Sequence, residues 1–244
     1  MSNYSHFKPS WNAPSGIRSY CSTRIGGVSQ RPYDSLNLGM HVGDLEVDVA
    51  KNRDSIRQFL GMPGEPLWLD QVHGNHVIVP ELTGDKPGQT GDAAFTTCAG
   101  RVLTIMVADC LPILLVSQDG EAIGAVHGGW KGLAAGIIEE TCARFSGKTP
   151  IIAWLGPCIG PCHYEVDEQV RRNFPESDLD AFHPGRDKSH WMLDLYQLAE
   201  RRLRAAGIED ISGGNCCTYC ESDRFFSYRR DGQTGRFAVF IWKD

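Results

Sequence analysis

Val102-Leu-Thr-Ile-Met-Val-Ala108, Ile113-Leu-Leu-Val-Ser117 and Ala122-Ile-Gly-Ala-Val126 form the stretch of sequence that decides the fold of this chain. All three segments are apolar and rich in β-branched residues, so each of them predicts a strand. Gln118-Asp-Gly-Glu121 separates the second segment from the third, and its Asp-Gly pair is a strong hairpin signal. We therefore expect antiparallel neighbours in the middle of a sheet.

Further strands and helices surround this block without strict alternation. The apolar patterns predict strands at 17–24, 67–69, 76–79, 151–155 and 237–242, and helices at 49–60, 133–145 and 193–206. Hairpins mixed with helices indicate an α+β fold. We expect a single domain over residues 1–244, with one mixed, mostly antiparallel sheet packed by helices.

The composition is that of an ordinary globular protein and argues against several classes of function. Hydrophobic residues make up 41% and charged residues 22% of the chain, and the net charge of −6 argues against nucleic acid as a partner. The sequence has no apolar run of about 18 residues and no charged N-terminal region followed by an apolar one, so we expect neither a membrane helix nor a signal peptide. Nine scattered cysteines, an odd number, argue against a disulfide framework and favour the reducing cytoplasm.

Three polar segments each carry one metal ligand where an apolar stretch ends. They are Asp70-Gln-Val-His-Gly74, Ala108-Asp-Cys-Leu-Pro112 and Val126-His-Gly-Gly-Trp-Lys-Gly132. Their ligands, His73, Cys110 and His127, are one short of a closed tetrahedron, which is typical of a catalytic zinc site with an open position. The alternative is a nucleophile pair, with Cys110 as the nucleophile and His127 as its base. The predicted hairpin brings Cys110 and His127 near each other, but the sequence does not place His73 beside them.

Other polar groups are candidates for binding a substrate or a phosphate. The turn after His127 lacks side chains at Gly128 and Gly129 and leads into a predicted helix, so backbone and helix N-terminus could hold an anion. Phe225-Phe-Ser-Tyr-Arg-Arg-Asp-Gly232 and Thr234-Gly-Arg236 place three arginines near a turn, where they bind phosphate or form a solvated hairpin tip. Asp109, next to Cys110, is either a partner of the site or a structural anchor.

A second cysteine group is a weaker candidate for a metal site. Cys158 and Cys162, together with Cys216-Cys-Thr-Tyr-Cys220, have a spacing that some zinc sites use. No second pair follows at the spacing of a zinc ribbon. Buried, unreactive thiols are therefore the default interpretation of these cysteines.

Taken in order, the motifs resemble the YfiH family, which is also described as multicopper polyphenol oxidoreductase or laccase-domain proteins. The resemblance rests on the following segments, which span most of the chain: Thr23–Ser29, Ser35-Leu-Asn-Leu-Gly39, Asp70–Gly74, Asp92-Ala, Ala108–Pro112, Val126–Gly132, Gly156-Pro-Cys-Ile-Gly160, Cys217-Thr218 and Phe226–Gly232. It implies an α+β fold shared with the catalytic domain of cytotoxic necrotizing factor toxins. It also implies one zinc ion per chain, held by His73, Cys110 and His127.

The resemblance further implies a purine nucleoside enzyme. Such an enzyme phosphorolyses adenosine, inosine and methylthioadenosine and deaminates adenosine, so its partners are a nucleoside and phosphate rather than nucleic acid or a membrane. Copper-dependent polyphenol oxidation is the older assignment for the family. The eight histidines of this chain are scattered and form no His-X-His repeat, so copper fits less well than zinc.

Residue roles follow from the chemistry that these reactions need. Phosphorolysis needs cations and N–H donors around phosphate, and the candidates are Arg53, Arg229, Arg230 and the turn at Gly129; Asn37 and Gln71 are further substrate-binding candidates. Deamination needs a zinc-activated water near the purine. Two rival hypotheses remain open: a zinc-free hydrolase or amidase acting on a peptidoglycan precursor through Cys110 and His127, and a protein that binds a nucleotide-linked wall precursor without turnover. The sequence does not indicate the oligomeric state.

Overall fold

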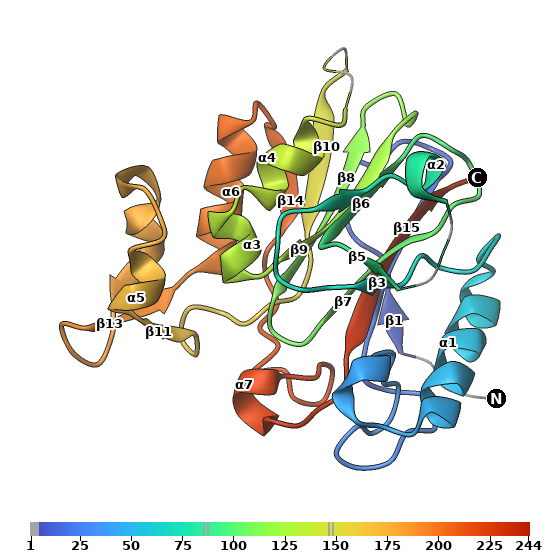
Figure 1. The fold of residues 1–244 in the computed structure, drawn as a ribbon, viewed down its shortest axis with the longest axis horizontal. Coiled ribbons are helices and arrows are strands. Elements are labelled where there is room, and N and C mark those ends of the chain that lie inside the picture. Colours follow the sequence, from blue (N-terminus) through green and yellow to red (C-terminus); the bar gives the residue numbers. More distant parts are fainter. Residues whose placement is uncertain (1–4, 85, 87, 146, 148) are drawn as a thin grey trace.

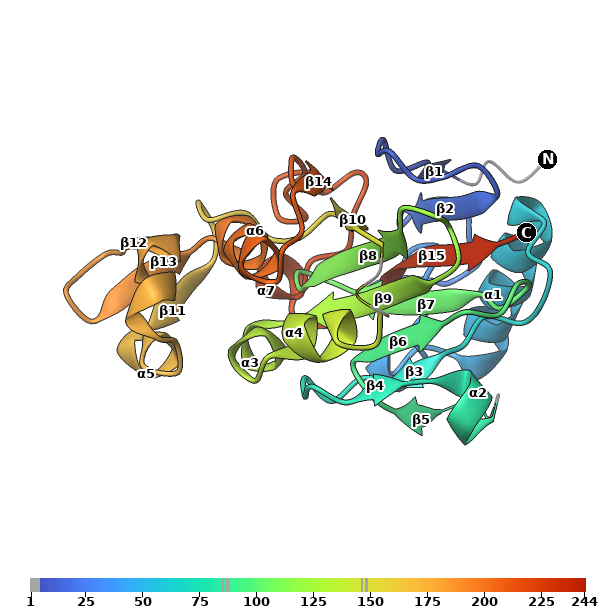
Figure 2. The ribbon, with the colours of Figure 1, turned by 90° about the horizontal axis from the view of Figure 1, so that it is seen from above.

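Two stacked β-sheets lie at the centre of the molecule, and helices cover the outer face of each (Figures 1 and 2). The computed structural model describes residues 5–84, 86, 88–145, 147 and 149–244, and within these ranges the strands form two main sheets and two small ones. The α+β class is confirmed. The expectation of one mixed sheet is wrong, because the predicted strands divide between two sheets.

The larger sheet is mixed and contains the predicted hairpin. Its strands lie in the order β14 (Asp210–Gly213), β10 (Ile151–Leu155), β8 (Leu111–Ser117), β9 (Ile123–Gly128), β6 (Ala93–Thr96) and β4 (Val77–Ile78). β8 and β9 pair in antiparallel fashion with Val116 opposite Ile123, which confirms the hairpin. The outer pairs β10·β14 and β4·β6 are parallel.

The smaller main sheet is antiparallel. It contains the 102–108 segment, which we expected to lie beside the hairpin. Its strands lie in the order β1 (His6–Phe7), β2 (Ile17–Ser22), β15 (Phe237–Lys243) and β7 (Leu103–Val107). Side chains alternate along β7: Leu103, Ile105 and Val107 pack between the two sheets, whereas Met106 packs in the cluster under helix α1. Both faces of β7 are therefore buried, and the chain crosses from one sheet to the other at residues 108–110.

Helices complete the layers. α3 (Trp130–Ala134), α4 (Ile137–Cys142) and α6 (Leu195–Ala205) lie against the larger sheet, and α1 (Glu46–Leu60) lies against the smaller one. The helix predicted at 133–145 is two helices, because Gly136 adopts a left-handed φ of 86° between them. The helix predicted at 193–206 is confirmed as α6. Asp194 caps α6 by accepting hydrogen bonds from two backbone N–H groups of its first turn.

The remaining helices and strands are short. β11 (Glu165–Asp167), β13 (His190–Leu193) and β12 (Phe182–Pro184) form a small sheet that projects to one side with α5 (Glu168–Arg171) and the 3-10 helix Glu176–Ala181 (Figure 1). The others are β3 (Leu69–Asp70), β5 (Gln89–Thr90), α2 (Pro80–Thr83), α7 (Tyr228–Asp231) and the 3-10 helix Met40–Val42. No helix in the described ranges has the length and apolar character needed to cross a bilayer.

Candidate active site

Three turns from distant parts of the chain bring His73, Cys110 and His127 together. Their ligand atoms all lie within 4.8 Å of one another, and the Sγ of Cys110 is 3.8 Å from the Nε2 of His73. His73 follows β3, Cys110 lies at the crossing between the two sheets, and His127 lies near the end of β9. His127 is buried and His73 is exposed, so the cluster faces solvent on one side.

A buried carboxylate positions two of these three residues. Asp92, just before β6, accepts hydrogen bonds from the backbone N–H groups of Val72, His73 and Gly74 at 3.2, 2.8 and 2.7 Å. These bonds hold the turn in which His73 has a left-handed φ of 63°. The same carboxylate lies 2.8 Å from the Nδ1 of His127, which leaves the Nε2 of that ring for the cluster.

Asp109 acts as a structural anchor at the third ligand. Its carboxylate accepts hydrogen bonds from the Thr218 hydroxyl and from the backbone N–H of Arg229, both at 2.6 Å. Its own φ is 99°, a conformation that turns the chain sharply just before Cys110. The buried carboxylate thus fixes the crossing between the sheets to the C-terminal segment.

The glycine after His127 leaves room for the cluster. A Cβ at Gly129 would lie 2.8 Å from the Cδ2 of His73 and 3.2 Å from the Sγ of Cys110. The backbone here has φ −71° and ψ 153°, which any residue could adopt. Close approach to the two ligands, rather than backbone conformation, therefore requires glycine at this position.

Cys110 and His127 strongly shift each other's pKa values. Burial alone raises the pKa of the Cys110 thiol, but the charge and hydrogen bond of His127 outweigh burial and lower that pKa to about 6. Burial likewise lowers the pKa of His127, but the Cys110 thiolate and the Asp92 hydrogen bond outweigh it and raise that pKa to about 9. Without a metal, the pair is therefore a thiolate beside an imidazolium at neutral pH.

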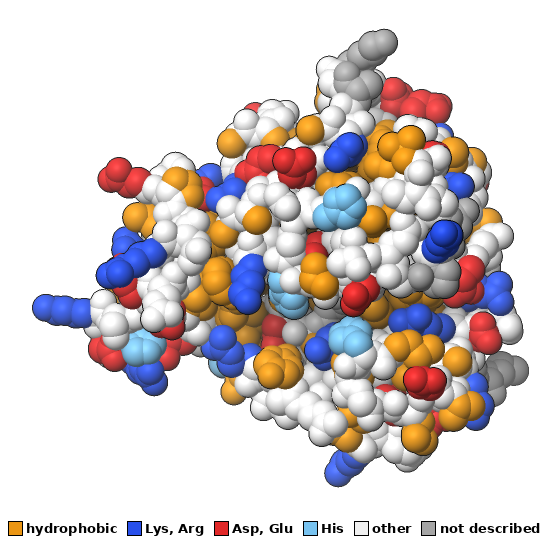
Figure 3. All heavy atoms as spheres, in the orientation of Figure 1, with side chains coloured by type: hydrophobic (Ala, Val, Ile, Leu, Met, Phe, Trp, Pro, Cys, Tyr) orange, Lys and Arg blue, Asp and Glu red, His pale blue; other side chains and the backbone are white. Residues whose placement is uncertain are grey.

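A cavity of about 440 Å³ opens beside the three ligands. Its walls include three cationic side chains, three aromatic rings and the His41 imidazole. Besides the cluster, its lining residues are His41, Gln71, Met106, Val107, Ala108, Asp109, Trp130, Lys131, Tyr164, Tyr228, Arg229 and Arg236. Figure 3 shows His side chains and Lys or Arg side chains gathered around a hollow on this face. Burial and the nearby Arg236 guanidinium lower the pKa of His41, so this imidazole is neutral at pH 7.

The candidate binding residues divide between the cavity and the surrounding structure. Gln71 and Arg229 line the cavity, although the Gln71 amide also bonds to both backbone polar groups of Met106 at 2.8 and 2.9 Å. Arg229 donates to the Glu165 carbonyl at 2.8 Å. Gly129 lies so close to the cluster that a Cβ there would meet His73 and Cys110.

Three other candidates have side chains that bond elsewhere in the fold. The Arg53 guanidinium donates to the Leu38 carbonyl at 2.8 Å and lies 3.8 Å from the centre of the Trp68 ring. Asn37 is buried, and its Oδ1 accepts from the backbone N–H of Arg236 at 2.9 Å. Arg230 donates to three backbone carbonyls, those of Thr218, Tyr219 and Phe225. None of these three side chains is among the described residues that line the cavity.

Several residues that line the cavity were not among the candidates predicted from the sequence. Trp130 and Lys131 stand inside the quoted Gly-rich motif, so their position next to His127 was an available signal. Tyr228 likewise stands inside the quoted segment Phe225–Gly232. His41 and Tyr164 belong to none of the quoted segments. They reach the cavity only through the fold.

The chain is similar to known proteins over nearly its whole length. A family model described as "Multi-copper polyphenol oxidoreductase laccase" matches residues 18–244. The chain belongs to this family. A "Purine nucleoside phosphorylase YfiH" of Shigella flexneri is 47% identical over 239 residues, which cover 96% of this chain and 97% of the relative. A purine nucleoside phosphorylase of Pseudomonas aeruginosa is 42% identical over 238 residues, 96% of each chain.

Solved structures of family members have the same fold. The crystal structure of a Neisseria meningitidis protein has a TM-score of 0.91 at 38% identity, and the match covers 98% of this chain and 99% of that one. YlmD from Geobacillus stearothermophilus has a TM-score of 0.86 at 33% identity, with 94% and 92% covered. The resemblance drawn from the sequence motifs is thereby confirmed.

Proposed function

We propose that this chain is a purine nucleoside phosphorylase with one zinc ion held by His73, Cys110 and His127. The observation that carries the proposal is the position of this ligand set at a cavity with both cationic and aromatic walls. The names of the bacterial relatives support it. The substrates would be adenosine, inosine and methylthioadenosine, together with phosphate.

The donor set suits zinc. Two imidazoles and one thiolate are ligands that zinc prefers, and Asp92 orients His127 from behind as carboxylates do at zinc sites. A blue copper site adds a weak axial methionine. Met106 lines the cavity, but its sulfur lies 3.6 Å from the Arg53 guanidinium. When bound, zinc would supply a Lewis acid beside the substrate.

The protein's own residues would bind and orient the two substrates. In phosphorolysis a phosphate oxygen forms a bond to C1′ of the ribose while the bond from C1′ to the purine nitrogen breaks. The electron pair of the broken bond goes to that nitrogen, which takes up a proton. Lys131, Arg229 and Arg236 would neutralise the phosphate, and the rings of Trp130 and Tyr164 would pack against the apolar faces of the nucleoside.

Product analysis with and without phosphate tests the proposal. We expect free purine base and ribose 1-phosphate from each nucleoside, in amounts that depend on phosphate and are lost in His73→Ala. His76→Ala is the matched control, since His76 is also exposed and lies three residues further on, outside the cluster. Base release without phosphate, or no release at all, would contradict phosphorolysis. Formation of inosine from adenosine in the same assay would reveal the deaminase activity that we propose as a second reaction.

A specific observation also favours a Cys–His hydrolase or amidase, acting on a peptidoglycan precursor. Cys110, His127 and Asp92 stand in the order nucleophile, base and orienting carboxylate. A metal-free hydrolase would keep its activity after chelation and lose it in Cys110→Ala. The phosphorylase would lose its activity on chelation and regain it with Zn²⁺. Phenol oxidation after loading with Cu²⁺ would support the copper oxidase instead.

We also propose a cytoplasmic location. All nine cysteines are free thiols, as expected in a reducing compartment. A purine nucleoside and phosphate would be available there. Fractionation of cells that express the tagged chain tests the location.

A further inference from the structure

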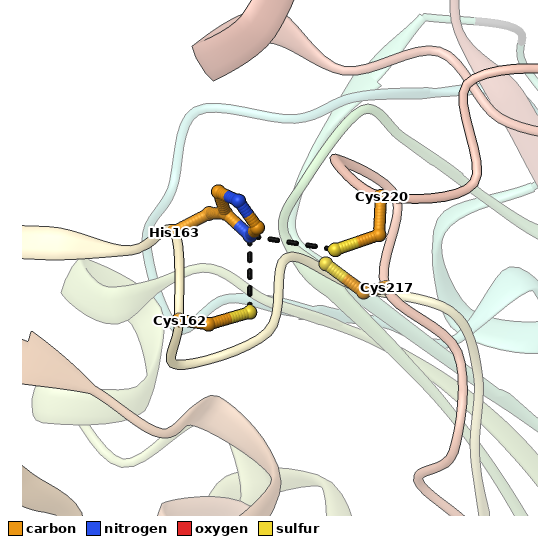
Figure 4. A group of neighbouring side chains, drawn as sticks. All are labelled: Cys162, His163, Cys217 and Cys220. Carbon is orange, nitrogen blue, oxygen red and sulfur yellow. Dashed lines mark hydrogen bonds between the residues drawn. The ribbon is translucent and has the colours of Figure 1, made fainter.

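A second group of soft metal ligands lies outside the candidate active site. Cys162 and His163, in the loop between β10 and β11, meet Cys217 and Cys220, in the segment between β14 and α7 (Figure 4). The ligand atoms of all four residues lie within 4.8 Å of one another. The cysteine group identified in the sequence does not include His163.

Two cysteines of the group identified in the sequence do not belong to this cluster. Cys158 is fully buried, and its Sγ lies 3.5 Å from a backbone carbonyl. The Sγ of Cys216 lies 3.7 Å from the Asn215 side chain. The remaining set is three cysteines and one histidine, which is a common ligand set of structural zinc sites.

The geometry of the four residues suits one ion. The Nδ1 of His163 lies 3.0 Å from the Sγ of Cys162 and 3.4 Å from the Sγ of Cys220. With Zn–S bonds of ~2.3 Å and a Zn–N bond of ~2.0 Å, tetrahedral ligand atoms lie about 3.5–3.8 Å apart. The four side chains therefore need only small rotations to surround a cation, and Figure 4 shows them turned toward one another.

Hydrogen bonds and ring stacking hold the two segments together around this position. The backbone N–H of Thr218 donates to the Cys158 carbonyl at 3.0 Å, which joins the two segments. The N–H of Gly160 lies 3.2 Å from the Sγ of Cys217, a contact that stabilises a thiolate. The ring of Tyr219 stacks on His163, with centroids 4.0 Å apart.

We propose that Cys162, His163, Cys217 and Cys220 form a second, structural zinc site. All four positions would be filled by protein, so this site would hold its ion without an open position for substrate. The ion would tie the 158–163 loop to the 217–220 turn. Tyr164 follows His163 directly and lines the cavity, with the Arg229 guanidinium 5.1 Å from its ring centre, so the site would hold one wall of the cavity in place.

Metal content of the intact protein, purified without chelator under reducing conditions, tests the proposal. We expect two zinc ions per chain in the wild type and one in Cys217→Ser/Cys220→Ser. The decisive variant is Cys110→Ala, which we expect to keep one ion in the second site. This result does not depend on the proposed phosphorylase activity. Cys216→Ser is the matched control, because it changes the adjacent cysteine outside the cluster, and we expect it to keep both ions.

Cobalt gives a readout that distinguishes the two sites even if a variant folds poorly. The intensity of the sulfur-to-cobalt charge-transfer band follows the number of thiolate ligands, which is three at the second site and one at the first. Loading Cys110→Ala with Co²⁺ should give the three-thiolate spectrum, and the loaded wild type should show four thiolates in total. Absence of bound metal from Cys110→Ala would overturn the proposal, as would a disulfide among the three cysteines in the freshly purified wild type.

Discussion

The Asp92 carboxylate and the His127 imidazole are in contact at 2.8 Å, and both side chains are buried. The same carboxylate holds the turn that carries His73. One residue thus sets the position of two of the three ligands in the candidate active site. Burial alone raises the pKa of Asp92, but the hydrogen bond and charge of His127 and the backbone N–H groups outweigh it, so the carboxyl stays ionised at neutral pH.

Replacing Asp92 by Asn should weaken metal binding by about 10- to 100-fold, because the amide loses the charge that orients His127. It should also lower stability by about 1–3 kcal/mol, because an amide N–H₂ would face a backbone N–H donor in the buried site. Competition with a chelator measures the affinity, and urea unfolding measures the stability. Asp119→Asn is the control, since Asp119 also accepts several hydrogen bonds but lies in the β8–β9 turn. Unchanged metal affinity in Asp92→Asn would contradict this role.

The stability of the metal-free protein should be nearly independent of pH between about 6.5 and 9, because the contributions of His127 and Cys110 change in opposite directions there. The pKa of His127 is raised from 6.5 to about 9, so its contribution is complete below 6.5 and is lost as pH rises through about 9. The pKa of Cys110 is lowered from 9.0 to about 6, so its contribution is present above 9.0 and is lost as pH falls through about 6. Urea midpoints of the metal-free wild type and of Cys110→Ser/His127→Gln, measured across pH, test this. The wild-type advantage should be nearly flat from about pH 6.5 to 9, whereas a steep change across that range would show that only one of the two groups is shifted and would contradict the thiolate–imidazolium pair.

Gly129→Ala should reduce metal affinity by roughly 10-fold or more with little loss of stability. The new methyl group would meet His73 and Cys110, and overpacking of this kind costs about 1–3 kcal/mol. Because His73 is exposed and can move away, the substitution should displace the metal ligands rather than disturb the packing of the core. Chelator competition and thermal unfolding measure the two effects. Gly64→Ala is the control, because its nearest heavy atom would be 3.5 Å away. Equal metal affinity in both variants would show that the close approach is unimportant.

The local pattern of the sequence was enough to predict the β8–β9 hairpin and helix α6. Both depend on residues near one another in the chain. The hairpin depends on the Asp119-Gly120 turn, and the helix depends on its apolar face and on Gly207, which follows its C-terminus. Gly136 is also a local signal for the division of the 133–145 helix, although no break was predicted there.

The placement of His73 and of β7 had no local signal. His73 reaches the cluster through the bonds of its turn to Asp92, which lies 19 residues away. β7 is apolar on both faces because a second sheet covers one face and α1 covers the other. An apolar run predicts a strand but does not indicate which neighbour covers each face. Arg53, Asn37 and Arg230 fit a phosphate site by residue type, yet in the structure their hydrogen bonds go largely to backbone groups.

Lys131→Gln should raise KM for phosphate by about 10- to 100-fold and leave KM for the nucleoside nearly unchanged. The lysine lines the cavity, and a hydrogen bond from a charged donor contributes about 1.5–3 kcal/mol. Initial rates at varied phosphate and at varied inosine separate the two constants. Lys51→Gln is the control, because Lys51 lies on α1 outside the described cavity lining. An equal rise in both KM values would assign Lys131 to the nucleoside or to general positioning.

Asn52→Ala should destabilise the protein by about 3 kcal/mol while leaving the ligand set intact. The side chain is buried on α1, accepts from the Val28 N–H at 2.9 Å and donates to three oxygens of the 29–37 segment at 2.9 to 3.2 Å. Alanine would leave these buried groups without their partner. For a chain of this size the loss corresponds to a drop in Tm of roughly 6–12 °C. Asn75→Ala is the control, since Asn75 is exposed and donates one hydrogen bond, to the Ala135 carbonyl. A small drop in Tm, equal in the two variants, would show that the 29–37 segment is held by other contacts.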